Sequence, residues 1–279
     1  MPVNPIGIMQ GRLLPKYHNR YQAHPVGYWQ DEFPKAEELG LNCIEFILDF
    51  NDAEINPLLR SDGPEEIQRL SEQTGIKVYT VCADYFMEAP LQHANEAVAT
   101  RSQSVLRRLL TQGKIFGLRD IIIPCIGQST LRSTAVQDCF MERFLPLVEE
   151  AESAGINLSL ETDLAPVPFA ELLARFDSHR VTVNYDTGNS AALGFDPVEE
   201  LSCYGKRISD IHIKDRVLGG GSVVLGDGDT QFERFFAALR PLCFKGPFIM
   251  QAYRDDEGAT VFKQQLAWMR EHFLDRLWI

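Results

Sequence analysis

Apolar and polar positions along the chain repeat a pattern that ends each time in a short apolar run. The segments EELGLNCIEF, EQTGIKVYTV, KIFGLRDIII and ESAGINLSLE share the order helix end, glycine, apolar residue, polar residue, strand. Their glycines, Gly40, Gly75, Gly117 and Gly155, stand where the end of a helix needs a left-handed residue. Helix, short loop and strand in repeated succession predict β/α units around a parallel sheet.

Eight strands are predicted from the apolar runs. They are expected near residues 6–10, 43–47, 78–82, 121–124, 157–161, 181–186, 208–214 and 248–251. Eight strands with intervening helices in 279 residues favour a closed (β/α)8 TIM barrel, predicted as a single domain over residues 1–279. An open doubly wound sheet is the alternative, but GRLLPKYHNR after the first strand contains neither GxGxxG nor GxxxxGK[ST].

Polar residues alternate with apolar ones in the later strands, in INLSLETD, VTVNYD and ISDIHIKD. Successive side chains of a strand point to opposite faces, and the outer face of a barrel meets apolar helices. The polar set is therefore predicted to face the barrel axis. On that side Glu161, Asp186 and His212 end three successive strands, and the same parity places Gln251 with them.

These four side chains predict a metal site. Carboxylate, imidazole and amide donors that converge at one end of a barrel suit a divalent ion, and a cation removes the cost of burying unpaired carboxylates. We expect one ion held by Glu161, Asp186, His212 and Gln251, with Mn²⁺ favoured and Mg²⁺, Co²⁺ or Zn²⁺ as alternatives. A lone acid at a strand end is more often a helix cap or a surface ion pair, so the prediction depends on all four together.

The stretches LETD, NYDTGN and IHIKDR, together with Gln251, resemble the xylose-isomerase-like TIM-barrel superfamily, which includes sugar and sugar-phosphate isomerases and epimerases related to tagatose 3-epimerase. GIMQGRL and VCADYFM are similar to one branch of its sugar isomerase/epimerase proteins. The resemblance covers nearly the whole chain. It implies a divalent metal on strands five to eight, at the four positions above, and proton transfer through a metal-stabilised enediolate.

The chain departs from the family pattern at one position. The family's epimerases usually carry a glutamate on strand eight that transfers a proton opposite the strand-five glutamate, whereas this chain has Gln251. An amide can lend its oxygen to a metal but cannot act as a base at neutral pH. Epimerisation beside a ketone normally takes two bases, while aldose–ketose isomerisation needs only one, here Glu161. The substitution weakens an epimerase assignment unless Lys214, Asp84 or another group serves the second face.

Further polar residues near the predicted strand ends are candidates for the site. Lys214 shares the inward parity of His212 and is predicted to be catalytic with Glu161, the alternative being a salt bridge to Asp163 or Asp215. The predicted substrate-binding residues are Gln10, Glu45, Asp84, Asn189, Arg216 and Arg254. Structural roles stay open for several of them: pairing with a core arginine, stabilising a turn, or standing in a solvated loop. The glycine-rich VLGGGSVVLGDGD is predicted to be an active-site lid or a plain solvent loop.

Composition and charge limit the partners and the cellular location that we expect. A net charge of −12 and a pI of 5.0 disfavour binding to nucleic acid. The chain shows no apolar signal segment and no run of about 18 apolar residues, so no membrane span is expected. Its six cysteines are scattered without a CxxC pair, which is typical of reduced thiols. We expect a cytoplasmic protein that binds a small sugar or sugar phosphate, with homo-oligomerisation left open.

The leading hypothesis is a divalent-metal-dependent isomerase or epimerase of a small sugar, sugar phosphate or hydroxy-carbonyl compound. A metal-dependent dehydratase of the inosose or dehydroshikimate type is an alternative, because loss of water also needs one base and a metal. A non-catalytic sugar-binding relative is another, because the strand-eight glutamate is missing. A nuclease like endonuclease IV is disfavoured by the acidic charge and by a content of only six histidines.

Overall fold

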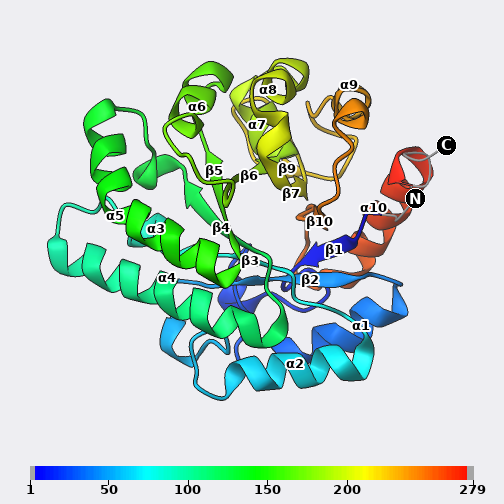
Figure 1. The fold of residues 1–279 in the computed structure, drawn as a ribbon. Coiled ribbons are helices and arrows are strands. Elements are labelled where there is room, and N and C mark those ends of the chain that lie inside the picture. Colours follow the sequence, from blue (N-terminus) through cyan, green and yellow to red (C-terminus); the bar gives the residue numbers. More distant parts are fainter. Residues whose placement is uncertain (1–3, 275–279) are drawn as a thin grey trace.

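The strands close into one parallel barrel in the computed structural model, which describes residues 4–274 (Figure 1). The barrel strands are β1 (Ile6–Met9), β2 (Cys43–Ile47), β3 (Thr80–Cys82), β4 (Asp120–Cys125), β5 (Asn157–Thr162), β6 (Val181–Asp186), β7 (Ile208–Ile213) and β10 (Phe248–Met250). Their order around the barrel is β1-β10-β7-β6-β5-β4-β3-β2, and every neighbouring pair is parallel. The predicted (β/α)8 barrel is confirmed.

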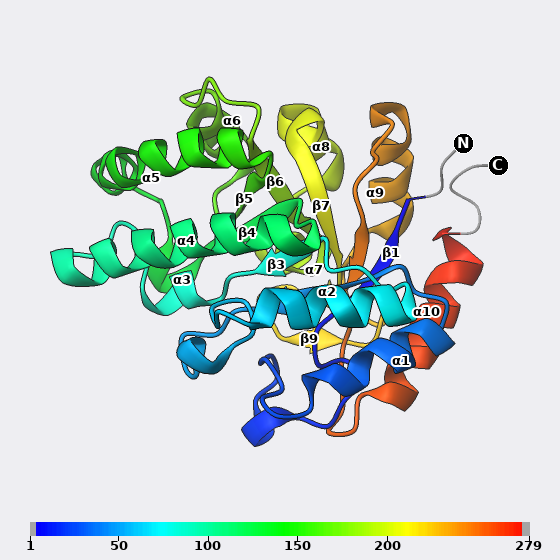
Figure 2. The same ribbon diagram turned by 60° about the horizontal axis from the view of Figure 1, so that its bottom comes forward.

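Helices surround the barrel (Figures 1 and 2). They are α1 (Glu32–Glu38), α2 (Gly63–Thr74), α3 (Tyr85–Glu88), α4 (Glu96–Phe116), α5 (Thr134–Ala154), α6 (Pro166–Leu173), α7 (Thr187–Leu193), α8 (Pro197–Tyr204), α9 (Phe232–Leu239) and α10 (Ala259–His272). Short 3₁₀ helices occur at Tyr17–Asn19, Trp29–Asp31, Ala53–Ile55, Gly127–Ser129, Gly205–Arg207 and Arg240–Leu242. Within residues 4–274, no helix combines the length and the apolar character needed to cross a bilayer.

The predicted boundaries lie close to the observed ones. The third strand begins at Thr80 instead of residue 78, and the last barrel strand ends at Met250 instead of residue 251. The glycines at the helix ends behave as predicted: Gly75 and Gly117 follow α2 and α4 with φ of 77° and 80°. That left-handed conformation lets each helix stop and the chain turn at once into the next strand.

Two groups of side chains stand out inside the barrel, and we call them sectors, while the outer faces of the strands pack against helices in the main core. One sector is apolar, comes from β1, β2, β3, β4 and β10, and consists of Met9, Cys43, Ile47, Cys82, Ile122 and Ile249. The other, which we call the polar sector, comes from β5, β6 and β7 and consists of Ser159, Glu161, Asn184, Asp186, Asp210 and His212, all buried. The outward residues of the strands pack against the helices, so the inward residues can be polar.

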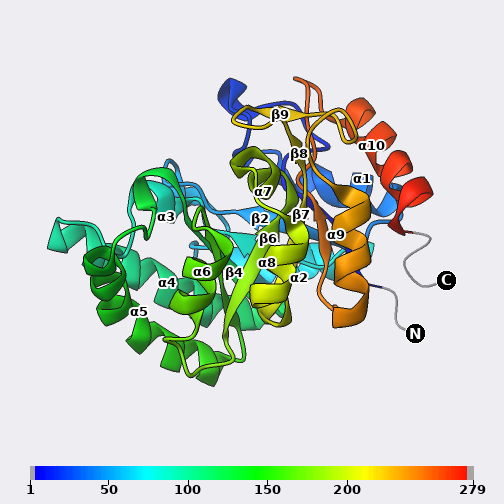
Figure 3. The ribbon, with the colours of Figure 1, turned by 90° about the horizontal axis from the view of Figure 1, so that it is seen from above.

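A short hairpin and the long segment after β1 lie at one end of the barrel (Figures 2 and 3). The hairpin pairs β8 (Asp215–Arg216) with β9 (Ser222–Val223) in antiparallel fashion, directly after β7. Because all barrel strands run in parallel, this is the end at which their carboxyl termini meet. Loops at this end carry the active sites of TIM-barrel enzymes.

Candidate metal centre

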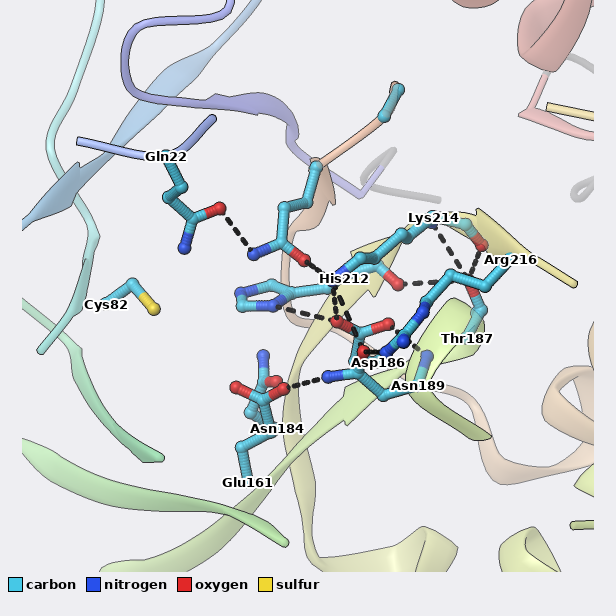
Figure 4. Close-up of polar contacts among 12 residues, drawn as sticks. Gln22, Cys82, Glu161, Asn184, Asp186, Thr187, Asn189, His212, Lys214 and Arg216 are labelled. Carbon is cyan, nitrogen blue, oxygen red and sulfur yellow. Dashed lines mark hydrogen bonds and ion pairs between the residues drawn. The ribbon is translucent and has the colours of Figure 1, made fainter. Parts of the chain in front are cut away.

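Three consecutive strands bring Glu161, Asp186 and His212 together. Asp186 is the last residue of β6, and it lies opposite His212 in the register of β6 with β7. Glu161 stands one residue before the end of β5. Each side chain offers one ligand atom, and these three atoms lie within 4.8 Å of one another. Figure 4 shows the three side chains converging on the same space.

The donor atoms of this group fit a divalent cation. Nδ1 of His212 is buried and has no hydrogen-bond partner among the described residues. It faces Oδ2 of Asp186 at 3.9 Å. A ring nitrogen without a partner beside two carboxylates is an open ligand position, and imidazole with carboxylate oxygen suits Mn²⁺, Co²⁺ or Zn²⁺.

Burial and mutual repulsion shape the protonation of the group. Burial and the charge of Asp186 raise the pKa of Glu161 to about 7, although His212 and Lys214 oppose the rise. Burial lowers the pKa of His212, but Glu45 and Asp210 outweigh it and raise the pKa to about 10. The neighbouring carboxylates therefore favour positive charge in this space, whether it comes from a proton or from a metal ion.

The Lys214 ammonium joins two of the four predicted ligands. Its Nζ lies 3.2 Å from Oδ2 of Asp186 and 3.1 Å from Oε1 of Gln251. Gln251 follows β10, so its amide oxygen reaches the group from the fourth strand, as predicted from parity. The expected alternative partner of Lys214, Asp163, instead pairs with Arg132 at 2.8 Å.

Asn189 connects the carboxylates to the two cations. Its Nδ2 donates to Oε1 of Glu161 at 2.5 Å, and its backbone N–H donates to Oδ1 of Asp186 at 2.8 Å, which caps α7. Its Oδ1 accepts from Nη1 of Arg216 at 2.8 Å and from Nζ of Lys214 at 3.3 Å. A single amide thus holds Glu161 on one side and Lys214 and Arg216 on the other (Figure 4).

Gln22 was missed by the sequence analysis. Its Oε1 accepts from Nε2 of Gln251 at 2.9 Å and from Nη2 of Arg12 at 3.1 Å, and its Nε2 donates to Oδ2 of Asp84 at 2.9 Å. It therefore connects the predicted ligand Gln251 to the predicted substrate residue Asp84, whose pKa is raised by burial. Gln22 lies in the irregular segment after β1, where no periodic pattern marks an inward side chain.

Three predicted substrate residues are engaged elsewhere. Gln10 accepts from the backbone N–H of Ile47 at 3.0 Å. Arg254 is buried and donates to the backbone carbonyls of Gly11 at 2.8 Å and Leu14 at 2.7 Å, so it joins the segments that follow β10 and β1. Glu45 lies within the barrel, where it contacts His212.

The comparison with protein families agrees with this geometry. Residues 33–272 match the model of the xylose isomerase-like TIM barrel. The chain belongs to this family. The resemblance inferred from the strand-end stretches is thereby confirmed. An L-ribulose-5-phosphate 3-epimerase, UlaE of Salmonella heidelberg (strain SL476), is 25% identical over 249 residues, covering 84% of this chain and 86% of that relative.

Two solved structures of the xylose isomerase-like fold superpose over nearly the whole chain. The 3-keto-D-glucoside 4-epimerase YcjR of E. coli has a TM-score of 0.74 at 18% identity and covers 96% of this chain and 99% of its own. A xylose isomerase-like TIM barrel protein of Mycobacterium smegmatis, solved in complex with magnesium, has a TM-score of 0.73 at 19% identity and covers 99% and 98%. At these identities the likeness shows the fold.

The glycine-rich run after β7, residues 217–229, is anchored by the carboxylate of Asp215. Asp215, fully buried, accepts hydrogen bonds from the backbone N–H groups of Gly226 at 2.9 Å, Gly228 at 3.0 Å and Thr230 at 3.0 Å. A Cβ on Gly228 would lie 2.3 Å from Oδ1 of Asp215, so only glycine lets the backbone approach this closely. The run, predicted as a lid or a solvent loop, contains β9, which pairs with β8, and most of a turn held by Asp215, the residue after Lys214.

Proposed function

We propose that the protein is a divalent-metal-dependent isomerase or epimerase of a small sugar, sugar phosphate or hydroxy-carbonyl compound. One observation carries this proposal: Glu161, Asp186 and His212 present ligand atoms within 4.8 Å of one another at the active-site end of a xylose isomerase-like barrel. With Gln251 they would hold the ion, preferably Mn²⁺. When bound, the ion would supply positive charge for the carbonyl and hydroxyl oxygens of the substrate. The named relatives, which are sugar epimerases, support this class of reaction.

Glu161 is the proposed base. Its pKa, raised to about 7 by burial and by Asp186, suits a group that must accept and release a proton near neutral pH. The amide of Asn189 donates to one of its oxygens at 2.5 Å and so fixes the direction of the carboxylate. Glu161 takes the proton from the carbon beside the carbonyl. In an isomerisation it returns that proton to the neighbouring carbon, and the hydroxyl proton of the substrate moves to the former carbonyl oxygen.

Lys214 is the proposed second proton-transfer group. Its ammonium lies on the other side of Asn189 from Glu161, and it contacts Gln251, which cannot carry a proton itself. In an epimerisation Lys214 gives a proton to the carbon from which Glu161 took one, on the opposite face. Glu161 then has one proton too many and Lys214 one too few, and exchange with solvent restores both.

Two other residues are proposed to bind the substrate. Asp84, held through Gln22 to Gln251, would accept hydrogen bonds from sugar hydroxyls. Arg216, held to Asn189 and to the carbonyl of Gly220, would border the substrate on the side of the β8–β9 hairpin. Both extend the hydrogen-bonded network that surrounds the metal ligands.

The cysteines support a cytoplasmic location for this activity. All six are free thiols, and Cys43, Cys82 and Cys125 are buried. Burial raises the pKa of these three thiols, which keeps them protonated and unreactive. We place the reaction in a reducing compartment, the cytoplasm, on this ground.

Solvent deuterium exchange tests the proposed function. Protein loaded with Mn²⁺ is incubated in D₂O with a panel of ketoses and ketose phosphates, and proton NMR follows the carbon beside the carbonyl. We expect deuterium uptake with at least one compound, with an aldose appearing for an isomerase and an epimeric ketose for an epimerase. Absorbance of an enone without such a product would indicate the dehydratase instead. A metal-loaded sample that labels no compound in the panel would contradict the proposal.

A further inference from the structure

The two ring nitrogens of His212 have different surroundings. Nε2 lies 2.7 Å from Oε1 of Glu45 and 3.5 Å from Oδ1 of Asp210, and all three side chains are 0% exposed. Nδ1, on the other side of the ring, has no hydrogen-bond partner among residues 4–274 and faces Asp186 at 3.9 Å. A neutral imidazole carries one proton, and the nitrogen within hydrogen-bond distance of a carboxylate, here Nε2 beside Glu45, is the one that keeps it.

Glu45 is the principal acceptor of that proton. The distance of 3.5 Å between Nε2 and Asp210 exceeds the usual limit of about 3.2 Å for an N–H···O hydrogen bond, whereas 2.7 Å to Glu45 is a short, charge-assisted one. Asp210 is itself held by Nδ2 of Asn184 at 2.7 Å, which fixes it at the longer distance. Glu45 therefore sets the orientation of the ring, and Asp210 adds negative potential.

The position of Glu45 in the barrel is otherwise hard to explain. It stands at the middle of β2, on the inward face between Cys43 and Ile47 of the apolar sector. β2 is separated from β7 by β1 and β10, so the Glu45 carboxylate reaches His212 through the interior. Burying a carboxylate costs several kcal/mol unless it is well paired. Glu45 is buried among apolar residues and contacts Nε2 of His212. This arrangement indicates that Glu45 acts through His212.

We propose that Glu45 is a positioning residue: it holds the proton of His212 on Nε2 and thereby presents the Nδ1 lone pair to the metal centre formed with Glu161 and Asp186. This inference rests on the metal centre of the proposed function. It also replaces the substrate-binding role predicted for Glu45, because a side chain with no exposed surface does not touch a sugar at the barrel mouth. Partners of this kind orient metal-bound histidines and typically change metal affinity about 10- to 100-fold when removed.

The same contacts predict a stoichiometry of one ion per chain. Glu45, Asp210 and His212 also present ligand atoms within 4.8 Å of one another, and Oε2 of Glu45 and Oδ2 of Asp210 are buried with no partner in the described part of the chain. A cation bound by Glu45, Asp210 and His212 would need the Nε2 lone pair, which would move the ring proton to Nδ1 and prevent binding at Glu161 and Asp186. Only one ring nitrogen can offer a lone pair at a time, and the contact of Glu45 with Nε2 leaves that of Nδ1 for the centre with Glu161 and Asp186.

Metal affinity in three variants tests the inference. Glu45→Met removes the acceptor while filling the space with an apolar chain, Glu45→Gln keeps an acceptor oxygen without charge, and Asp120→Asn removes a buried interior charge that bonds to Ser209 and Asn157 instead of His212. Isothermal titration with Mn²⁺ is expected to show a 10- to 100-fold weaker dissociation constant for Glu45→Met. Glu45→Gln and Asp120→Asn should resemble each other and lie nearer the wild type, because both lose charge but neither leaves Nε2–H without a close acceptor.

Nitrogen-15 NMR of histidine-labelled protein gives a readout that a purely structural role would not change. In the Zn²⁺-loaded wild type we expect a slowly exchanging Nε2–H of His212 and a metal-shifted Nδ1. In Glu45→Met the Nε2–H signal should exchange rapidly or be lost. Unchanged Mn²⁺ affinity and unchanged His212 signals in a folded Glu45→Met would overturn the inference alone. Two bound ions per wild-type chain would overturn it as well. A wild type that binds no Mn²⁺ would overturn the proposed metal centre itself.

Discussion

The apolar and polar sectors of the barrel interior are built on the same kind of parallel strand but bury different side chains. In the apolar sector Ile47, Ile122 and Ile249 are fully buried in one cluster with two cysteines. In the polar sector Asp210 and His212 are buried to the same extent, yet Oδ2 of Asp210 and Nδ1 of His212 have no hydrogen-bond partner within residues 4–274. Equal burial thus favours folding in one sector and opposes it in the other, because apolar surface gains free energy on leaving water and unpaired polar groups lose it.

This difference shows where the chain gives up stability to bury polar side chains. Strands β5, β6 and β7 have six residues each and keep apolar residues such as Leu158, Leu160 and Val183 on their outer faces. Helix packing on that outer face holds the strands while their inner face carries acids and an imidazole. Glu45 reaches from a strand of the apolar sector to His212 of the polar sector.

The largest expected effect is in the polar sector, at Glu161. Glu161→Gln removes the proposed base but keeps its shape, so solvent deuterium exchange should fall about 10³-fold. The free energy of unfolding should stay constant or rise, because a buried carboxylate with a pKa raised to about 7 is replaced by a neutral amide. Exchange rates by NMR and denaturant titration measure the two quantities. An exchange rate within tenfold of the wild type would remove Glu161 from the chemistry.

The next effect belongs to the apolar sector. Ile122→Ala leaves a cavity among Met9, Cys43 and Ile249 and should lower the free energy of unfolding by about 2–4 kcal/mol. The dissociation constant for Mn²⁺ should change less than about twofold, because none of the four predicted ligands belongs to that cluster. Urea titration and calorimetry in the same buffer test both statements. A matched loss of metal affinity would mean that the sectors are mechanically coupled.

A buried acid outside both sectors gives a pH test. Glu32 on α1 accepts hydrogen bonds from the backbone N–H groups of Gly11 at 2.7 Å and Leu13 at 2.9 Å, and burial raises its pKa to about 7. Because the folded state binds this proton more tightly than the unfolded state, its stabilising contribution is complete below about pH 4.5 and is lost as the pH rises through about 7. The stability of the wild type relative to Glu32→Gln should therefore fall over this window, by about 3 kcal/mol at most.

Thermal melts of the two proteins at several pH values measure that difference. A curve for wild type minus Glu32→Gln that is flat between pH 4.5 and 7, or that rises, would show that the two backbone contacts keep Glu32 charged throughout. Such a result would make Glu32 resemble a paired surface acid.

The smallest expected effect is at the end of β10. Gln251→Glu places a carboxylate 3.1 Å from Lys214 Nζ, where the amide oxygen now lies, and restores the residue usual in the family's epimerases. Mn²⁺ affinity should rise on the order of tenfold, because an added negative ligand strengthens cation binding. Competition titration measures the affinity, and the melting temperature controls for folding. A weaker affinity would indicate that Lys214 and the new carboxylate pair too tightly to admit the ion.

The fold followed from local rules. Alternation in residues 157–161 and 181–186 predicted both the strands and their inward sides, and the glycines at 40, 75, 117 and 155 predicted the helix ends, all of which have positive φ. The convergence of Glu161, Asp186, His212 and Gln251 at one end followed from parity as well. These are properties of one strand and of the regular geometry of a barrel, so no long-range information was needed.

Other features depended on contacts that a single strand does not reveal. Parity placed Glu45 on the inward side, but not its depth: it lies at the middle of β2, where its carboxylate contacts His212. Gln22 reaches Gln251 from an irregular segment 229 residues away in sequence. Arg254 is held by carbonyls whose direction depends on the path of the segment after β1.

Asp215 accepts three hydrogen bonds from the turn at Gly226–Thr230. We therefore expect the position of the neighbouring Lys214 to be independent of the length of the loop between them. Residues 217–225 lie between Arg216 and this turn, so we expect changes in their number to leave the turn at Gly226–Thr230 closed on the same carboxylate. The barrel mouth would thus have an exchangeable border beside the fixed amine of Lys214. Grafting loops of different length between Arg216 and Gly226, with Gly220 kept for its contact with Arg216, therefore tests whether this border sets the selectivity of the proposed reaction.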